Sequence, residues 1–138
     1  MKKKKYIIIF VVIIVIAAAV GVLMIISIKL DTVFLRKSSQ AYENVYVIDG
    51  NNGNSVKILD KEKEELFEKL KSLEWTRDFF HKPLTEWLYH IQFIMEGELY
   101  IITIVDDNCI AVNENKFYKA ETERLIDFIR ERLQVRLI

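Results

Sequence analysis

The residues whose types could support covalent chemistry are one cysteine and two histidines, Cys109, His81 and His90. A cysteine nucleophile needs a base within hydrogen-bonding distance, and histidine is a common base. In the strand register expected below, His90 lies opposite Thr103 on the less apolar face of a sheet, and Cys109 points to the same face. Nothing in the sequence brings either histidine to Cys109, and a lone cysteine in a small sheet is more often a buried apolar residue. We therefore predict no catalytic site and no enzymatic activity.

A metal site is also not expected. The segment from Asp49 to Asp60 approaches the ligand spacing of a calcium-binding loop. However, Asn54 stands where the sharp turn requires glycine, Lys57 occupies a ligand position, and no helix precedes the loop. Two histidines without HExxH-type spacing do not form a zinc motif, and one cysteine excludes an internal disulfide or a cysteine cluster. The sequence thus predicts no cofactor.

Large aromatic residues surround an irregular segment that contains the only proline of the chain, Pro83. Such a segment can form a groove for a peptide or ligand. The alternative is that its aromatic side chains seal the edge of a small core. The candidate partner-binding residues are Trp75, Phe79, Phe80, His81 and Trp87.

The apolar run from Tyr6 to Ile28 predicts a single transmembrane helix. At about 1.5 Å per residue it would be roughly 34 Å long, enough for a hydrocarbon core of about 30 Å. The rival interpretation is a signal peptide cleaved after Ala19, which would leave an apolar tail as the new N-terminus. We expect an uncleaved anchor.

The charges predict how the chain is oriented. Lys2, Lys3, Lys4 and Lys5 precede the apolar run, which favours a cytoplasmic N-terminus and an extracytoplasmic domain at the cell membrane. The part of the chain after the run contains 16 basic and 20 acidic residues. The domain therefore lacks the basic surface that nucleic-acid binding requires. The expected partners are the lipid bilayer and an envelope protein, and the oligomeric state is open.

Four segments follow from these patterns. They are a basic cytoplasmic tail (1–5), the transmembrane helix (6–28), a juxtamembrane stalk (29–43) and an extracytoplasmic domain (44–138). Phe34, beside basic residues in the stalk, suits the headgroup region of a membrane.

The domain is expected to have an α+β fold. Two β-branched runs, 45–48 and 56–59, predict a hairpin around residues 49–54. Its register is open. A loop of even length pairs Val47 with Val56 or Ile58, whereas a loop of odd length brings Tyr46 and Ile48 to those partners instead. A helix follows over 61–73, with Asp60 as its N-cap and an apolar stripe of leucines and Phe67.

A β-meander and a second helix complete the expected domain. Alternation from Trp87 to Met95, followed by a turn at Glu96-Gly97, predicts a strand pair. The pairs are Phe93 with Tyr100, Ile91 with Ile102 and Tyr89 with Ile104, followed by Ile110 with Ile104 and Val112 with Ile102. The last helix begins near Ala120 and reaches about Leu133. The two helices then cover one face of an antiparallel sheet. This domain follows the N-terminal transmembrane helix in the chain.

Residues 45–75, the strands at 87–93 and 96–104, and the hairpin at 111–119 together resemble small membrane-anchored ectodomains of Gram-positive bacteria. In these domains an aspartate ends a strand and starts a helix, and a later hairpin carries a glycine turn. Glu114-Asn115 stands where that glycine turn is usual. The family has no established activity, so the resemblance implies a fold and a location and transfers no catalytic residue.

The leading hypothesis is therefore a single-pass protein whose extracytoplasmic domain is a non-enzymatic binding module at the cell envelope. The alternative is an immunity or inhibitor protein that acts on a toxin or an envelope hydrolase through the aromatic segment from Trp75 to Trp87.

Overall fold

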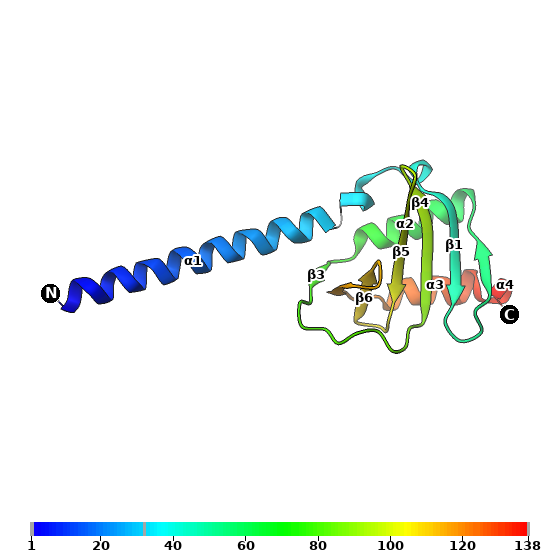
Figure 1. Ribbon diagram of the computed structural model, residues 1–138. Helices are drawn as coiled ribbons and strands as arrows, with labels where there is room; N and C mark the ends of the chain where they lie inside the picture. The colour runs from blue at the N-terminus through cyan, green and yellow to red at the C-terminus, as the bar shows by residue number, and fades with distance from the viewer. Residues whose placement is uncertain (1, 32, 138) are drawn as a thin grey trace. The chain divides into compact units, whose positions relative to one another are not determined.

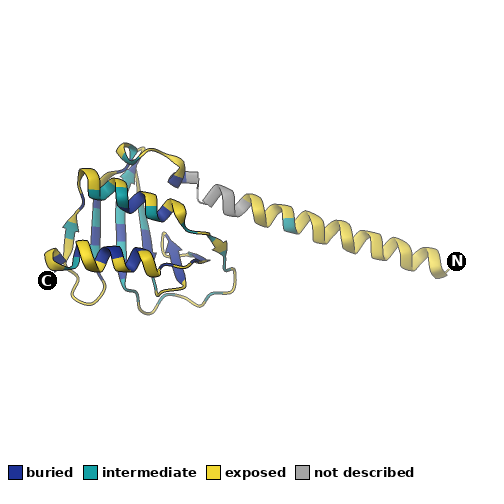
Figure 2. Ribbon diagram, turned by 180° about the vertical axis from the view of Figure 1, so that it is seen from behind, coloured by how far each residue is buried: buried dark blue, intermediate teal, exposed yellow. Residues whose placement is uncertain are grey.

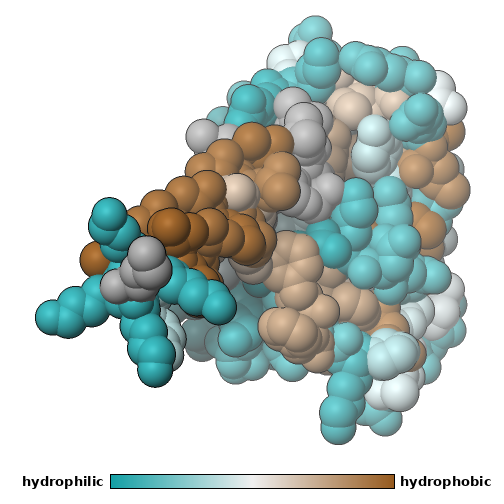
Figure 3. Space-filling model, turned by 60° about the vertical axis from the view of Figure 1, so that its left-hand side comes forward, coloured by the Kyte–Doolittle hydropathy of each residue, from teal (hydrophilic) through white to brown (hydrophobic). Residues whose placement is uncertain are grey.

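The computed structural model describes residues 2–31 and 33–137, with side chains for residues 2–26 and 34–137. The chain divides into two compact units, Met1–Val33 and Phe34–Ile138. The first contains the helix α1 (Lys2–Asp31), in which the large apolar side chains from Tyr6 to Ile26 are exposed. Figure 3 shows this helix as a brown, apolar surface with a teal, basic end. Within the described residues it is the one helix long and apolar enough to cross a membrane, a property it shares with signal sequences.

The second unit is built from short helices and a sheet (Figure 1). Its entry segment contains the 3-10 helices η1 (Val33–Arg36) and η2 (Ser39–Ala41). The strands are β1 (Glu43–Asp49), β2 (Ser55–Lys57), β3 (Thr76–Arg77), β4 (Tyr89–Met95), β5 (Glu98–Ile104), β6 (Cys109–Val112) and β7 (Lys116–Lys119). The helices are α2 (Asp60–Ser72), α3 (Glu123–Arg132) and α4 (Gln134–Leu137).

All seven strands form one open antiparallel sheet in the order β2-β1-β4-β5-β6-β7-β3. The helices α2 and α3 lie along one face of this sheet (Figures 1 and 2). The expected α+β fold is therefore confirmed. We call the opposite side, which carries His90, Thr103, Cys109, Ala111 and Phe117, the outer face.

The register of the meander agrees with the expectation. Phe93 pairs with Tyr100, Ile91 with Ile102 and Tyr89 with Ile104. Ile110 and Val112 of β6 then pair with Ile104 and Ile102. In the first hairpin, Val47 pairs with Val56, which settles the register as that of an even-length loop.

The main core lies between the sheet and the two helices. Alternate residues of β4 are buried because successive side chains of a strand point to opposite faces. The helices contribute the expected stripes, with Leu66, Phe67 and Leu70 from α2 and Leu125 and Ile129 from α3, all with 0% of their surface exposed. Figure 2 shows dark-blue buried segments alternating with exposed ones along both helices.

The predicted N-cap of α2 was wrong. Asp60 has a φ of 51°, whereas a capping residue normally has an extended backbone. Leu59 takes the N-cap position, and among the described residues no side-chain hydrogen bond caps the helix. The buried Ile58, whose N–H donates to Val45 O at 2.8 Å, holds the chain against β1 just before the helix.

The predicted stalk also differs from the structure. Residues 34–42, here called the collar, belong to the second compact unit, and Phe34, Leu35 and Tyr42 are buried in it. The Phe34 ring stacks on Tyr100 with centroids 5.1 Å apart, so Phe34 is a core residue and not a headgroup residue. The aromatic end of the sheet offers this ring an apolar environment that sequence position alone did not reveal.

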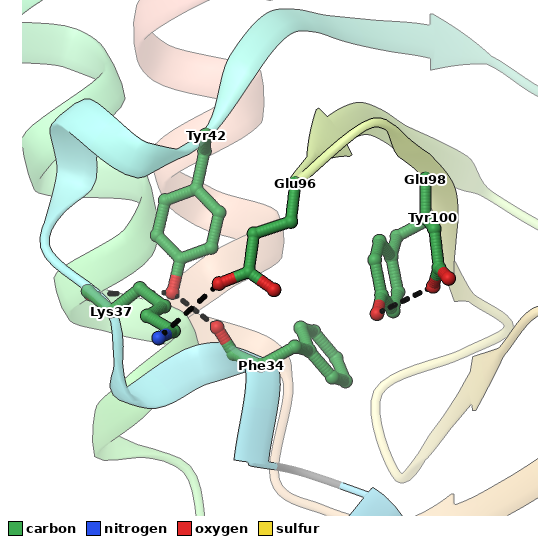
Figure 4. A network of polar contacts seen from close by, with 6 residues as sticks. All are labelled: Phe34, Lys37, Tyr42, Glu96, Glu98 and Tyr100. Carbon is green, nitrogen blue, oxygen red and sulfur yellow. Dashed lines mark hydrogen bonds and ion pairs between the residues drawn. The ribbon is translucent and has the colours of Figure 1, made fainter.

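The collar is fastened by a small polar network (Figure 4). The Tyr42 hydroxyl donates to Phe34 O at 2.6 Å and lies 3.3 Å from Lys37 O. Lys37 Nζ forms an ion pair with Glu96 Oε1 at 3.3 Å, and Lys71 Nζ donates to Lys37 O. Burial raises the pKa of Tyr42 to about 12, while the backbone bond to Lys37 acts in the opposite direction.

The polar loop from Asp49 to Asn54 contacts the C-terminal helix. The side-chain amides of Asn52 and Asn54 each donate to Leu137 O at 3.0 Å. Asp49 Oδ1 accepts the N–H of Asn51, and its Oδ2 accepts from Gln134 Nε2. These contacts give the polar residues of the loop a structural role in joining the first hairpin to α4.

Candidate functional site

The candidate partner-binding residues are carried mainly by the irregular segment between β3 and β4, here called the 78–88 loop. Its first residue is held by the N–H of Asp78, which donates to Phe117 O at 2.8 Å. Its last residue, Leu88, donates to Ile104 O at 2.9 Å and accepts the N–H of Gly50 at 2.8 Å. The loop is therefore bound to the sheet at both ends.

The loop also covers a second, small core on the outer face. Cys109, Ala111 and Phe117 form this cluster, and Leu84 of the loop packs against it with Val105. The outer face is consequently apolar where the loop crosses it. This explains why residues on the less apolar side of the meander are buried as deeply as Ala111, which has no exposed surface.

His81 of the loop contacts Cys109, a pairing that sequence spacing did not predict. Its ring stacks on Phe117 with centroids 4.2 Å apart, and its Nε2 lies 3.4 Å from Cys109 Sγ. Its Nδ1 lies 2.6 Å from Lys82 O, which can only accept a hydrogen bond. In neutral His81 the proton is thus on Nδ1, and Nε2 accepts from the Cys109 thiol.

Cys109, His81 and Lys82 O are thus arranged like a nucleophile, a base and a group that orients the base. The electrostatic environment opposes such a role. Burial, together with the charges of Asp106 and Asp78, raises the pKa of Cys109 to about 11. Because the thiolate is the nucleophile, a thiol that stays protonated at neutral pH is poorly suited to catalysis. The pair acts chemically as a weak hydrogen bond that fastens the loop.

Trp87 and His90 form the second contact between the loop and the outer face. Their rings stack with centroids 3.5 Å apart and an interplanar angle of 11°. In a regular strand, residues three apart point to opposite faces, so the expected strand assignment of Trp87 was wrong. The regular alternation begins at Tyr89, the first residue of β4.

Two buried polar atoms lie beside this stack. His90 Nε2 and Thr103 Oγ1 have no hydrogen-bond partner among the described residues. His90 and Thr103 are directly paired across β4 and β5, as the register predicted. Burial lowers the pKa of His90, while the charge of Glu114 has the opposite, smaller effect.

Phe79 and Phe80 are the exposed part of the site. Phe80 is 95% exposed and Phe79 is 45% exposed, although both residues are large and apolar. The guanidinium of Arg77 lies 5.1 Å from the centre of the Phe79 ring. The N–H of Phe80 donates to Asp78 Oδ1 at 3.3 Å. The backbone at Phe80 is thus held while its side chain projects into solvent.

Trp75 lies apart from the other candidates. Its Nε1 donates to Leu70 O at 3.1 Å, and its ring makes an edge contact with Tyr118 on the helix-covered side. The structure therefore brings His81 and Trp87 onto the outer face, presents Phe79 and Phe80 from the same loop, and uses Trp75 to close the main core.

A polar groove near Cys109 was not predicted from the sequence. It is lined by charged residues of both signs, including Lys69, Glu74, Asp78, Asp106, Lys119 and Arg124. Cys109 also borders it, although only 7% of that residue is exposed. These residues are scattered along the sequence, so no local pattern could have signalled the groove. Among the residues with described side chains, no group of three or more His, Cys, Asp or Glu is placed to hold a metal ion.

Comparisons of the chain with protein-family models, with curated proteins and with solved structures find no match.

Proposed function

We propose that the protein is a single-pass membrane protein whose α+β domain is extracytoplasmic and binds a protein partner at the cell envelope without performing chemistry. The exposed apolar surface of α1 supports a membrane anchor, because such a surface is stable in lipid and unfavourable in water. Lys2, Lys3, Lys4 and Lys5 support a cytoplasmic N-terminus. The α+β fold is in keeping with the resemblance to Gram-positive membrane-anchored ectodomains.

An uncleaved anchor is favoured over a signal peptide. The helix α1 continues from Lys2 to Asp31, past the candidate cleavage site after Ala19. Residues 20–26 beyond that site are as apolar as those before it and largely exposed. Cleavage would leave them as an apolar tail in water.

The single observation that carries a binding role is the exposure of Phe80. A side chain of this size that is 95% exposed costs hydration free energy unless a partner covers it. Its neighbours are held by Asp78, Arg77 and the His81 contacts, so little conformational entropy is lost when a partner binds. Phe80 therefore has the properties of an anchor residue that fills an apolar pocket of a protein partner.

The location is tested with reporter fusions to the full chain. A phosphatase that is active only outside the cytoplasm is joined to the C-terminus, and in a second fusion to the N-terminus. We expect activity from the C-terminal fusion alone. An inactive C-terminal phosphatase, together with an active cytoplasmic reporter at the same position, would refute the proposed orientation.

Binding is tested with a photo-crosslinking amino acid placed at Phe80 in cells. The matched control carries the same amino acid at Glu64, an exposed residue of α2. We expect a discrete crosslinked protein from position 80 and none from position 64. Equal crosslinking at the two positions, or none at position 80, would contradict a specific binding role for Phe80.

A second candidate function is inhibition of a toxin or an envelope hydrolase. The observation that favours it is the fastening of the 78–88 loop at both ends, because inhibitory loops gain affinity from a preformed conformation. Replacing Phe79 and Phe80 by Ala is then expected to abolish protection while the circular dichroism spectrum stays unchanged. Full protection by the doubly substituted protein would exclude this candidate.

A further inference from the structure

The only two histidines of the chain both lie in contacts that hold the 78–88 loop on the sheet. His81 is on the loop and contacts Phe117 and Cys109 of the sheet. His90 is on the sheet and contacts Trp87 of the loop. Histidine is the side chain whose ordinary pKa lies between pH 5 and 8. The Trp87 end of the loop is therefore attached through a group, His90, that changes charge in acidic solution.

We propose that protonation of His90 releases the Trp87 side chain from the outer face, so that this part of the 78–88 loop is closed at neutral pH and open in acid, while the backbone hydrogen bonds of Leu88 remain. The inference rests on the proposed binding function and adds a regulation of the same site.

The geometry of the closed loop disfavours an imidazolium at His90. Both ring nitrogens of a charged histidine carry a proton and need acceptors. Nε2 is enclosed and has no partner among the described residues, and no hydrogen bond joins it to Thr103. Attraction between the charged ring and the face of Trp87 opposes opening, but it does not supply the missing acceptor.

Few charged groups surround His90. The neighbouring strands face it with Ile48 from β1 and Thr103 from β5, neither of which is charged. On the loop, Glu86 precedes Trp87 and is exposed. Glu114, between β6 and β7, is the carboxylate whose charge acts on His90 and favours protonation. Burial outweighs this effect, so the pKa of His90 in the closed state is lower than usual.

The direction of the pH dependence follows from this difference. The open state exposes His90 and restores the ordinary pKa of about 6.5. Because the closed state binds protons less readily, its stability is fully present above about pH 6.5 and falls as the pH decreases toward the lower pKa of the closed state. The acidic side of neutrality is thus the range in which the loop opens.

The fit of Trp87 against the first hairpin makes the same end of the loop sensitive to added volume. A Cβ atom at Gly50 would lie 2.2 Å from Trp87 O and 2.9 Å from Trp87 Cε3. The backbone oxygen cannot rotate away, so Gly50→Ala must separate the first hairpin from this part of the loop. This substitution gives an opened loop that does not depend on the charge of His90.

The test measures the accessibility of Trp87 in the full chain in detergent micelles. Trp75→Phe leaves Trp87 as the only tryptophan, and acrylamide quenching of its fluorescence reports exposure. We expect quenching to rise about twofold from about pH 7.5 to about pH 5, with unchanged far-ultraviolet circular dichroism. The midpoint should coincide with the His90 titration measured by NMR. Quenching that stays constant while His90 titrates would overturn the proposal.

Three variants in the Trp75→Phe background separate the causes. His90→Phe keeps an aromatic ring under Trp87 but cannot be protonated, so its quenching should stay low at every pH. His81→Gln should retain the transition, and Gly50→Ala should show high quenching already at neutral pH. A transition that persists in His90→Phe refutes the role of His90. If His90→Phe fails to fold, agreement or disagreement between the quenching and NMR midpoints of the parent still decides.

The closing experiment separates this regulation from the binding function. Crosslinking from position 80 is compared at about pH 7.5 and about pH 5 in wild-type and His90→Phe chains. We expect acid to reduce crosslinking in the wild-type chain only. Crosslinking that is equal at both pH values would leave the binding function intact and refute its regulation, whereas no crosslinking at either pH would refute the binding function.

Discussion

At the scale of single residues, burial determines what the ionisable groups can do. Cys109 and His81 are in contact, yet the thiol is held protonated by burial and by nearby carboxylates. Tyr42 is buried as well, and its hydroxyl is used to hold the backbone of the collar. Residue type alone would suggest chemistry at Cys109, and the environment assigns it a structural role.

The reactivity of Cys109 provides a direct test of this conclusion. Its pKa is raised from the ordinary 9.0 to about 11. Since each pKa unit changes the thiolate fraction tenfold, alkylation by iodoacetamide at about pH 8 should be about 100-fold slower than for an ordinary thiol. The same chain unfolded in denaturant is the control and should react at the ordinary rate. Rapid alkylation of the folded chain would indicate an activated thiol and would revive an enzymatic role.

The Tyr42 hydroxyl is expected to stabilise the collar. Tyr42→Phe leaves the buried Phe34 carbonyl without its donor, which should lower the free energy of unfolding by about 1–3 kcal/mol. Tyr46→Phe in β1 is the matched control and should change it by less than about 0.5 kcal/mol. Chemical denaturation of the full chain in detergent measures both. Equal effects of the two substitutions would show that the Tyr42 hydrogen bond contributes nothing specific.

At the scale of elements, α2 is held to the sheet by an aromatic cluster. The Phe67 ring stacks on Tyr42 with centroids 3.9 Å apart and makes an edge contact with Phe93 at 5.2 Å. Phe67 is completely buried, so its contacts join α2, the collar and β4 at one point.

Phe67→Ala should therefore be severely destabilising. Removing a buried phenylalanine ring is expected to cost about 3–5 kcal/mol of unfolding free energy, because both transfer free energy and packing are lost. Glu68→Ala, at the exposed neighbouring position, should cost less than about 0.5 kcal/mol. A loss below about 1 kcal/mol for Phe67→Ala would mean that the cluster repacks around the vacated space.

Elements with a periodic sequence were predictable, and the segments between them were not. The alternation of β4 and the leucine stripe of α2 each have a period that fixes which face is buried, so the pairing of Ile91 with Ile102 followed from the sequence. Phe34 and Trp87 lie outside the segments in which apolar residues recur with a regular period. Their positions depend on contacts that such a period does not specify. The Phe34 ring packs on Tyr100, and the Trp87 ring stacks on His90.

The candidate site was only partly predictable for the same reason. Aromatic composition indicated the 78–88 loop, and the register placed His90 beside Thr103. The contact between His81 and Cys109 depends on how an irregular loop crosses the outer face, which no local rule specifies. The exposure of Phe80 likewise follows from the packing of its neighbours.

At the scale of the whole molecule, the collar moves the boundary of the domain toward the N-terminus. The second compact unit begins at Phe34, and the collar contributes three buried side chains to it. A boundary at residue 44, as the sequence suggested, would remove Phe34, Leu35 and Tyr42 from the core.

This boundary can be measured with two truncated proteins. A fragment of residues 34–138 should unfold cooperatively, whereas a fragment of residues 44–138 should lose at least about 3 kcal/mol, because burial of each large apolar side chain contributes about 1.5–3 kcal/mol. Urea denaturation of the two fragments gives the difference. Equal stability of the two fragments would show that the collar contributes nothing to the stability of the domain.

The lengths of the outermost strands have a consequence for many copies of the chain on one surface. The sheet ends in β2, with three residues, and in β3, with two, while the central strands β1, β4 and β5 have seven each. Long unpaired edges are templates for intermolecular β-pairing and aggregation. If α1 anchors the chain as proposed, its copies are concentrated in two dimensions, where such pairing would be favoured by proximity. Because its edge strands are short, neighbouring copies of this sheet are expected to resist pairing with one another even when they are crowded.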